Sequence, residues 1–173
     1  EQTMPPLRGI VHAAGTLDDR TLLDMDADRF LHVMAPKVVG AFHLHSLCQN
    51  THLDFFVLFS SVASLLGAPG QANYAAGNAF LDGLAHARRR AGLAGTSIHW
   101  APFTDIGHDE SHSEQEQRMS HRGIEGITSA QGLFALSRLL ERPRAEVAIL
   151  RLSLHQWLDF YPHVAGSPYW SEL

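Results

Sequence analysis

A serine, a tyrosine and an asparagine lie close together within residues 55–80, FFVLFSSVASLLGAPGQANYAAGNAF. Ser61 ends an apolar run with the pattern of a strand, and Tyr74 begins a helical run. Strand ends and the helix starts that follow them meet at the carboxyl edge of an α/β sheet, where such folds bind ligands. Tyr74 and Asn78 share one helix face because they are four residues apart. This order indicates carbonyl chemistry, although on pattern alone Tyr74 is equally a half-buried helix tyrosine.

Strand and helix patterns alternate along the chain and predict the elements that position these side chains. Strands are expected at residues 7–13, 54–60, 96–100 and 145–150. Helices are expected at residues 26–48, 72–91, 129–141 and 155–160. The alternation predicts parallel βαβ units and therefore an α/β fold, in one domain that spans residues 1–173.

Two segments receive more specific expectations. Asp26 is the expected N-cap of the helix of residues 26–48. The apolar spacing of that helix predicts a buried face made of Phe30, Val33, Met34, Val38, Phe42 and Leu47. Residues 105–123 are polar, rich in His, Glu and Gln, and without a clear period, so they are expected to form a mobile flap.

Composition limits the class of protein. The chain has 173 residues, of which 45% are hydrophobic and 18% charged, as in ordinary globular proteins. Its formal net charge of -5 gives no electrostatic case for nucleic acid or an anionic membrane. The basic run at residues 88–90 is expected to be a solvated helix cap. Cys48, the only cysteine, is expected to pack in the core and favours a reducing compartment, so a cytoplasmic location is expected.

A nucleotide-binding turn is the feature that this architecture normally has and that the sequence lacks. Gly67 and Gly70 lie between a strand and a helix, but the G-x-G-x-x-G spacing is absent. The sheet is therefore expected to begin at its middle, without its first strands and their glycine-rich turn.

Several motifs in register resemble the ketoreductase domains of modular type I polyketide synthases, within the short-chain dehydrogenase/reductase superfamily. The motifs that carry the resemblance are His12-Ala13-Ala14-Gly15, Lys37, Ser60-Ser61, Tyr74 and Asn78. It covers nearly the whole chain and corresponds to the C-terminal part of the catalytic subdomain. The implied fold is a Rossmann-like three-layer sandwich with a parallel sheet.

The resemblance implies NADPH-dependent reduction of a β-ketoacyl group carried by an acyl carrier protein. Tyr74 would be the proton donor and Ser61 the carbonyl donor. Lys37 would stabilise the phenolate and bond the nicotinamide ribose, and Asn78 would serve the proton relay. Most of the superfamily has Tyr-x-x-x-Lys, so Asn78 marks the polyketide enzymes. The alternative without catalysis is that Lys37 is a solvated helix lysine and Ser61 a strand-end cap.

Further positions follow from the same resemblance. The expected cofactor contacts beyond Lys37 and Tyr74 are Ala13, Ala14, Gly15, Pro102, Phe103 and Thr104. Residues 105–123 would be the substrate lid. Stereochemical control is assigned to Asp18, Asp19, Leu66, Pro69 and Asn73, which match B-type motifs and imply a product of D configuration. His12 is expected to be a core histidine, and no metal site is expected from His108, His112 and His121.

Two other functions remain open from the sequence. The chain could be a non-catalytic structural half, or a fragment active only when it is complemented by a missing N-terminal Rossmann portion. An ordinary free-standing dehydrogenase fragment is disfavoured by Asn78, which stands where lysine would be expected. The expected partners are a phosphopantetheinyl acyl carrier protein and either the missing N-terminal portion or neighbouring synthase domains. The chain alone is expected to bind NADPH poorly.

Overall fold

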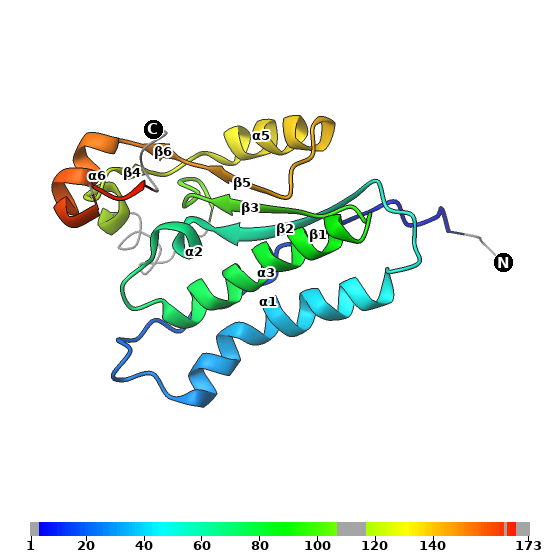
Figure 1. Ribbon diagram of the computed structural model, residues 1–173, viewed down its shortest axis with the longest axis horizontal. Coiled ribbons are helices and arrows are strands. Elements are labelled where there is room, and N and C mark those ends of the chain that lie inside the picture. The colour runs from blue at the N-terminus through cyan, green and yellow to red at the C-terminus, as the bar shows by residue number, and fades with distance from the viewer. Residues whose placement is uncertain (1–3, 107–116, 165, 169–173) are drawn as a thin grey trace. The chain divides into compact units, whose positions relative to one another are not determined.

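A computed structural model of the chain describes residues 4–106, 117–164 and 166–168 (Figure 1). The chain divides into two compact units, Glu1–Trp100 with Ser137–Ala148, and Ala101–Leu136 with Ile149–Leu173. Most of the predicted flap, together with His108 and His112, lies outside the described residues.

A four-stranded sheet forms the centre of the first unit, in the order β1-β2-β3-β5. Its strands are β1 (Gly9–His12), β2 (Phe55–Ser61), β3 (Thr96–Trp100) and β5 (Glu146–Ile149). The β1–β2 and β2–β3 pairs are parallel, and Ser61 lies opposite Trp100 in the second pair. The predicted α/β fold with a parallel sheet is confirmed.

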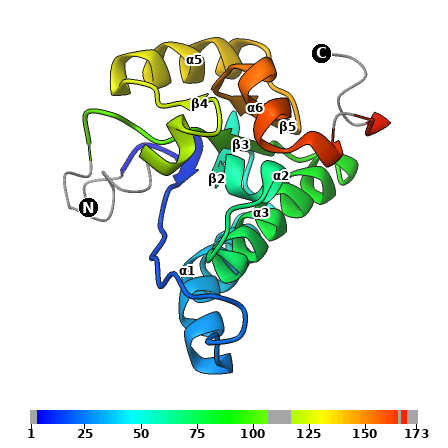
Figure 2. The same cartoon turned by 90° about the vertical axis from the view of Figure 1, so that its left-hand side faces the viewer.

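Two long helices, α1 (Ala27–Leu47) and α3 (Ala72–Arg90), pack against each other and lie on the same side of β2 and β3 (Figure 2). Asp26 caps α1 as predicted, since its Oδ1 accepts from the backbone N–H of Arg29 at 2.8 Å. Gly77 lets the two helices approach closely, because a Cβ there would lie 3.5 Å from the Lys37 side chain. This contact brings Lys37 against the helix that carries Tyr74.

The predicted buried face of α1 is partly wrong. The buried residues of the helix are Val33, Lys37 and Ala41, whereas Phe42 is 53% exposed and Leu47 is 80% exposed. The close approach of α1 to α3 favours small residues and one long flexible stem on the inward side. The larger apolar residues counted in the periodicity therefore do not all face the core.

The basic run at the end of α3 also differs from expectation, because Arg88 is only 1% exposed. Its Nε donates to the carbonyl of Ala94 at 2.7 Å, and its Nη1 lies 2.9 Å from Nδ1 of His45. Its guanidinium stacks on the ring of Phe56, with 3.8 Å between the guanidinium carbon and the ring centroid. Arg88 is therefore a packed residue, not a solvated cap. Cys48 lies in the same hydrophobic core as Phe56, as predicted.

The second unit contains smaller elements. Strand β4 (Ile124–Glu125) pairs antiparallel with β6 (Arg151–Leu152), and α6 (Leu154–Phe160) leads into a 3₁₀ turn at Pro162–Val164. Helix α5 (Ser129–Glu141) begins in this unit and ends in the first. Among the described residues, no helix combines the length and the apolar character needed to cross a membrane.

Candidate active site

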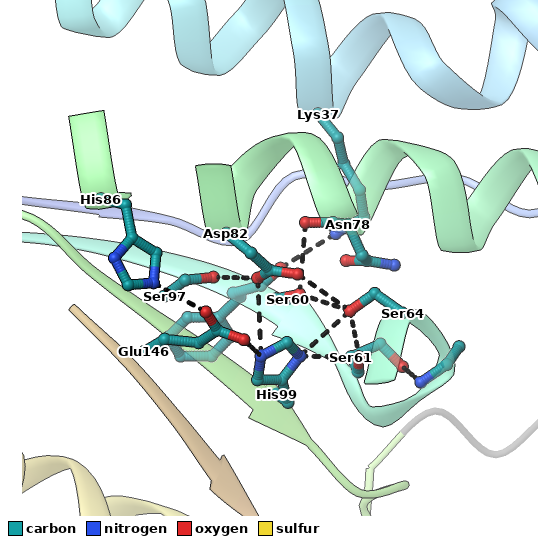
Figure 3. A network of polar contacts seen from close by, with 12 residues as sticks. Lys37, Ser60, Ser61, Ser64, Asn78, Asp82, His86, Ser97, His99 and Glu146 are labelled. Atoms are coloured by element: carbon teal, nitrogen blue, oxygen red, sulfur yellow. Dashed lines mark hydrogen bonds and ion pairs between the residues drawn. The ribbon is translucent and has the colours of Figure 1, made fainter. Parts of the chain in front are cut away.

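Lys37, Ser61, Tyr74 and Asn78 come from α1, the end of β2 and α3, all in the first unit, and the fold brings them together (Figure 3 shows three of them). The Lys37 side chain reaches between the helices toward the sheet, where Nζ donates to the carbonyl of Phe59 at 2.9 Å. Nζ also lies 5.3 Å from the centroid of the Tyr74 ring. The amino group of Lys37 therefore lies beside the ring of Tyr74.

The charge of Lys37 is held in a largely dry environment. The residue is only 3% exposed, which excludes the alternative of a solvated helix lysine. Burial lowers the pKa of Lys37 from 10.5 to about 8, and the charge of Asp82 acts in the opposite direction. At pH 7 most of the side chain is therefore still an ammonium ion.

Opposing effects act on the pKa of the Tyr74 phenol. Burial raises the pKa of the Tyr74 phenol above 10.0, whereas the hydrogen-bonding side chains of Ser61 and Asn78 lower it. The negative charge of Asp19 raises it further. The phenol consequently holds its proton at neutral pH, as an acid must before it acts.

Ser61 has two structural positions at once, because it ends β2 and is the N-cap of the short helix α2 (Val62–Leu66). Its Oγ accepts from the backbone N–H of Ala63 at 3.2 Å. The cap uses a lone pair of the hydroxyl oxygen, not its proton, and the hydroxyl also contacts the phenol of Tyr74. The capping role and the predicted catalytic role are thus compatible. The sequence pattern did not predict α2.

Asn78 is fully buried and uses only part of its amide group. Its Nδ2 donates to the backbone carbonyl of Tyr74 at 2.9 Å. Its Oδ1 has no hydrogen-bond partner within the described residues. A buried acceptor left unpaired costs about 1–3 kcal/mol, so this oxygen is suited to receive a donor from a water or a ligand.

The residues expected to contact the cofactor are found in both units of the chain. His12 packs as a core histidine, with Nε2 3.0 Å from the carbonyl of Pro36, and burial lowers its pKa. Ala13, Ala14 and Gly15 follow, exposed, at the carboxyl end of β1. A Cβ on Gly15 would lie 3.3 Å from Cε of Lys37, so this exposed segment runs beside Lys37.

Pro102, Phe103 and Thr104 belong to the second unit. There Phe103 forms an isolated bridge with Ile127, and the backbone N–H of Thr104 donates to the Ile127 carbonyl at 2.9 Å.

The segment assigned to stereochemical control is fixed to the start of α3. Nδ2 of Asn73 donates to the carbonyl of Asp18 at 3.0 Å, and Nε2 of Gln71 donates to Oδ2 of Asp19 at 2.9 Å. Arg29 binds both carboxylate oxygens of Asp18, at 2.7 and 2.9 Å. The sequence interpretation missed Gln71 and Arg29, which have no distinguishing spacing. Leu66 ends α2, and Pro69 is exposed in the loop that follows.

A second polar cluster lies next to Ser61 (Figure 3). The sequence interpretation missed this cluster as well. Donor atoms of Asp82, His99 and Glu146 all lie within 4.8 Å of one another, a set that could hold a divalent cation. They already have partners in the structure: the Ser97 hydroxyl donates to Asp82, and Nε2 of His99 lies 2.7 Å from Glu146.

The sequence of the chain matches the family described as the KR domain over residues 1–105. It is 38% identical over 167 residues to a phenolphthiocerol/phthiocerol polyketide synthase polypeptide of Mycobacterium tuberculosis. It is 40% identical over 149 residues to 6-methylsalicylic acid synthase of Aspergillus terreus. These matches cover 96% and 86% of the chain but only 7% and 8% of the two relatives.

Solved structures give the same result. An A-type ketoreductase from a modular polyketide synthase superimposes with a TM-score of 0.86 at 33% identity, covering 91% of this chain and 33% of that one. The first ketoreductase of the tylosin synthase superimposes with a TM-score of 0.82 at 32% identity, covering 91% and 34%. The chain thus spans about a third of the solved domains. It belongs to the KR domain family, the ketoreductase domains of polyketide synthases.

Proposed function

We propose that this chain supplies the proton-donating part of an NADPH-dependent ketoreductase, which reduces a β-ketoacyl group on an acyl carrier protein. The observation that carries the proposal is the buried ammonium of Lys37, 5.3 Å from the centroid of the Tyr74 ring. Burying a charge is costly, so a buried ammonium beside a phenol indicates a chemical role.

The side chains have distinct tasks in this proposal. Ser61 donates its hydroxyl proton to the substrate carbonyl and polarises it. Tyr74 transfers its proton to the carbonyl oxygen as negative charge develops there. Lys37 stabilises the resulting phenolate. The unpaired Oδ1 of Asn78 accepts from a water through which Tyr74 regains its proton.

NADPH fits these residues in part, and when bound it supplies the hydride. Lys37 and Tyr74 would face its nicotinamide ribose, and the exposed backbone of residues 13–15 would lie beneath it. The described residues contain no glycine-rich turn for the pyrophosphate.

This incomplete cofactor site leads to the first prediction. The chain alone is expected to show no saturable NADPH fluorescence change up to about 1 mM, a limit equivalent to about -4 kcal/mol of binding free energy. Adding the N-terminal segment of a solved ketoreductase, which this chain does not span, is expected to restore binding and reduction of a β-ketobutyryl-pantetheine thioester. Tight binding by the chain alone would contradict the prediction. Restored binding without reduction would favour a non-catalytic structural half.

The D configuration of the product is proposed from the motifs around Asn73, whose amide holds the Asp18 carbonyl. In the complemented enzyme, Asn73→Ala is expected to lower the excess of the D-hydroxy product by about tenfold, equivalent to about 1.4 kcal/mol between the competing transition states. Chiral chromatography of the product measures this. The exposed Asn50→Ala is the matched control and should leave the ratio unchanged. An L product from the unmodified enzyme would refute the assignment.

A further inference from the structure

Two side chains that do not take part in the proposed proton transfer lie close to the main chain of Ser61. Oγ of Ser64 is 2.9 Å from the Ser61 carbonyl oxygen. Nδ1 of His99 is 3.0 Å from the same Ser64 hydroxyl. Ser64 lies on α2, the helix that Ser61 caps, so the two side chains bear on the segment that carries the serine hydroxyl.

Both of these contacts are anchored to rigid elements. Ser64 lies 3.0 Å from Oδ2 of Asp82 on α3, and Oδ1 of Asp82 accepts from Ser97 on β3 at 2.6 Å. Nε2 of His99 lies 2.7 Å from Oε1 of Glu146 on β5. The cluster joins α2, α3, β3 and β5 within the first unit (Figure 3).

The two nitrogens of the His99 ring have different tasks. An ionised carboxylate only accepts hydrogen bonds, so Nε2 donates to Glu146. With the ring proton on Nε2, Nδ1 can only accept, and its donor is the hydroxyl of Ser64 at 3.0 Å. The ring is 2% exposed and cannot exchange these partners for water without leaving its site.

The outer end of the cluster is different, because His86 contacts the second oxygen of Glu146 at 2.8 Å. His86 and Glu146 line an open depression of about 460 Å³. This end reaches solvent, whereas the end at Ser61 is buried.

We propose that His99 is a positioning residue for the reduction: held by Glu146, its Nδ1 accepts from the Ser64 hydroxyl, fixes the first turn of α2, and thereby aims the hydroxyl of the capping Ser61 at the substrate carbonyl. The inference rests on the proposed function. It extends the site by a residue that lies 38 positions from Ser61 in the chain. Because a displacement of about 1 Å in a catalytic group costs up to about 10²-fold in rate, a loosened Ser61 should lower kcat measurably.

Three substitutions of His99 distinguish the roles of its ring nitrogens Nδ1 and Nε2. The amide of His99→Asn occupies the position of Nδ1, the amide of His99→Gln reaches the position of Nε2, and His99→Ala removes both. In the complemented enzyme, kcat is expected to stay within about threefold for His99→Asn and to fall by about tenfold or more for the other two, with KM changed less than about threefold. Equal losses in the Asn and Gln variants would overturn the proposal.

Amide hydrogen exchange of residues 62–66, measured on the whole 173-residue chain, tests the same idea without any activity. Exchange is expected to accelerate in the Ala and Gln variants and to remain at the original rate in the Asn variant. If the complemented enzyme reduces no ketothioester, the proposed function fails, yet this comparison still decides whether His99 fixes the segment. Uniform exchange across all three variants would refute it.

His45→Asn is the matched control. His45 is another partly buried histidine of the first unit, bonded to Arg88 and remote from Ser61 in the contacts described. This change is expected to lower the melting temperature while leaving kcat and the exchange of residues 62–66 unchanged. If kcat of the His99 variants merely followed their melting temperatures, as with His45→Asn, the role of His99 would be structural only.

Discussion

Tyr74→Phe is expected to lower kcat for β-ketothioester reduction by at least about 10²-fold, the lower end of the contribution of a positioned general acid. Burial raises the pKa of this phenol, and the hydrogen-bonding side chains of Ser61 and Asn78 lower it. Phenylalanine keeps the ring against Lys37 but has no proton to give. The loss should therefore fall on kcat with little change in KM. Loss of NADPH absorbance in the complemented enzyme measures it.

The matched control for this change is Tyr161→Phe. Tyr161 packs on Trp157, with 4.6 Å between the ring centroids, in the second unit. Removing its hydroxyl should leave turnover within about twofold, as for most changes away from the chemistry. Near-normal turnover of Tyr74→Phe would remove Tyr74 from the proposed mechanism.

Lys37→Met is expected to lower kcat by about 10²-fold and at the same time to raise the free energy of unfolding. The fall in the pKa of Lys37 from 10.5 to about 8 corresponds to about 3 kcal/mol spent on burying the charge. Methionine removes this cost but leaves the Phe59 carbonyl without its donor, which costs about 1–3 kcal/mol. A net gain of about 1 kcal/mol at pH 7 is expected. Urea unfolding of the whole chain measures it.

The same residue predicts the pH dependence of stability and activity. Because the pKa of Lys37 is lower in the folded chain than in the unfolded one, the unfolded chain binds more protons between about pH 8 and 10.5. The free energy of unfolding should therefore receive a rising contribution from Lys37 across this window, and Lys37→Met should abolish it. Turnover should fall above about pH 8, as the ammonium beside Tyr74 is lost.

Lys37 is the only lysine in the chain, so its ε-methylene NMR signal can be assigned without ambiguity and titrated directly. A value near 10.5 would contradict both the stability gain and the alkaline loss of turnover. If the free energy of unfolding of Lys37→Met rose with pH as steeply as that of the unmodified chain, the predicted contribution of Lys37 to the pH dependence of stability would be contradicted.

The element bounds could be predicted well wherever a local signal marked them. Asp26 caps α1, and Gly92, with a positive φ of 75°, follows the end of α3, so both helices were placed within about one residue of their ends. Helix α2 was missed because five residues are too few to show a helical period. It depends on the cap at Ser61, which looks like a strand end in the sequence.

The site could be predicted only where its residues share an element or a recognised order. Tyr74 and Asn78 are joined by helix spacing. Asp82, His99 and Glu146 are distant in sequence, on α3, β3 and β5, and meet only when the helix packs on the sheet, which periodicity does not fix. The inward position of Arg88 could not be predicted for a related reason, because its partner His45 becomes a neighbour only after α1 and α3 pack.

The cap formed by Ser61 on α2 has a consequence for how sequences of this kind evolve. The same oxygen that is assigned to the substrate also satisfies the backbone N–H of Ala63, and loss of such a cap costs about 0.5–2 kcal/mol. A descendant that no longer needed the reaction would still lose stability on losing this serine. Retention of this serine in diverging copies would therefore reflect its role as the N-cap of α2 as much as its role in the reaction.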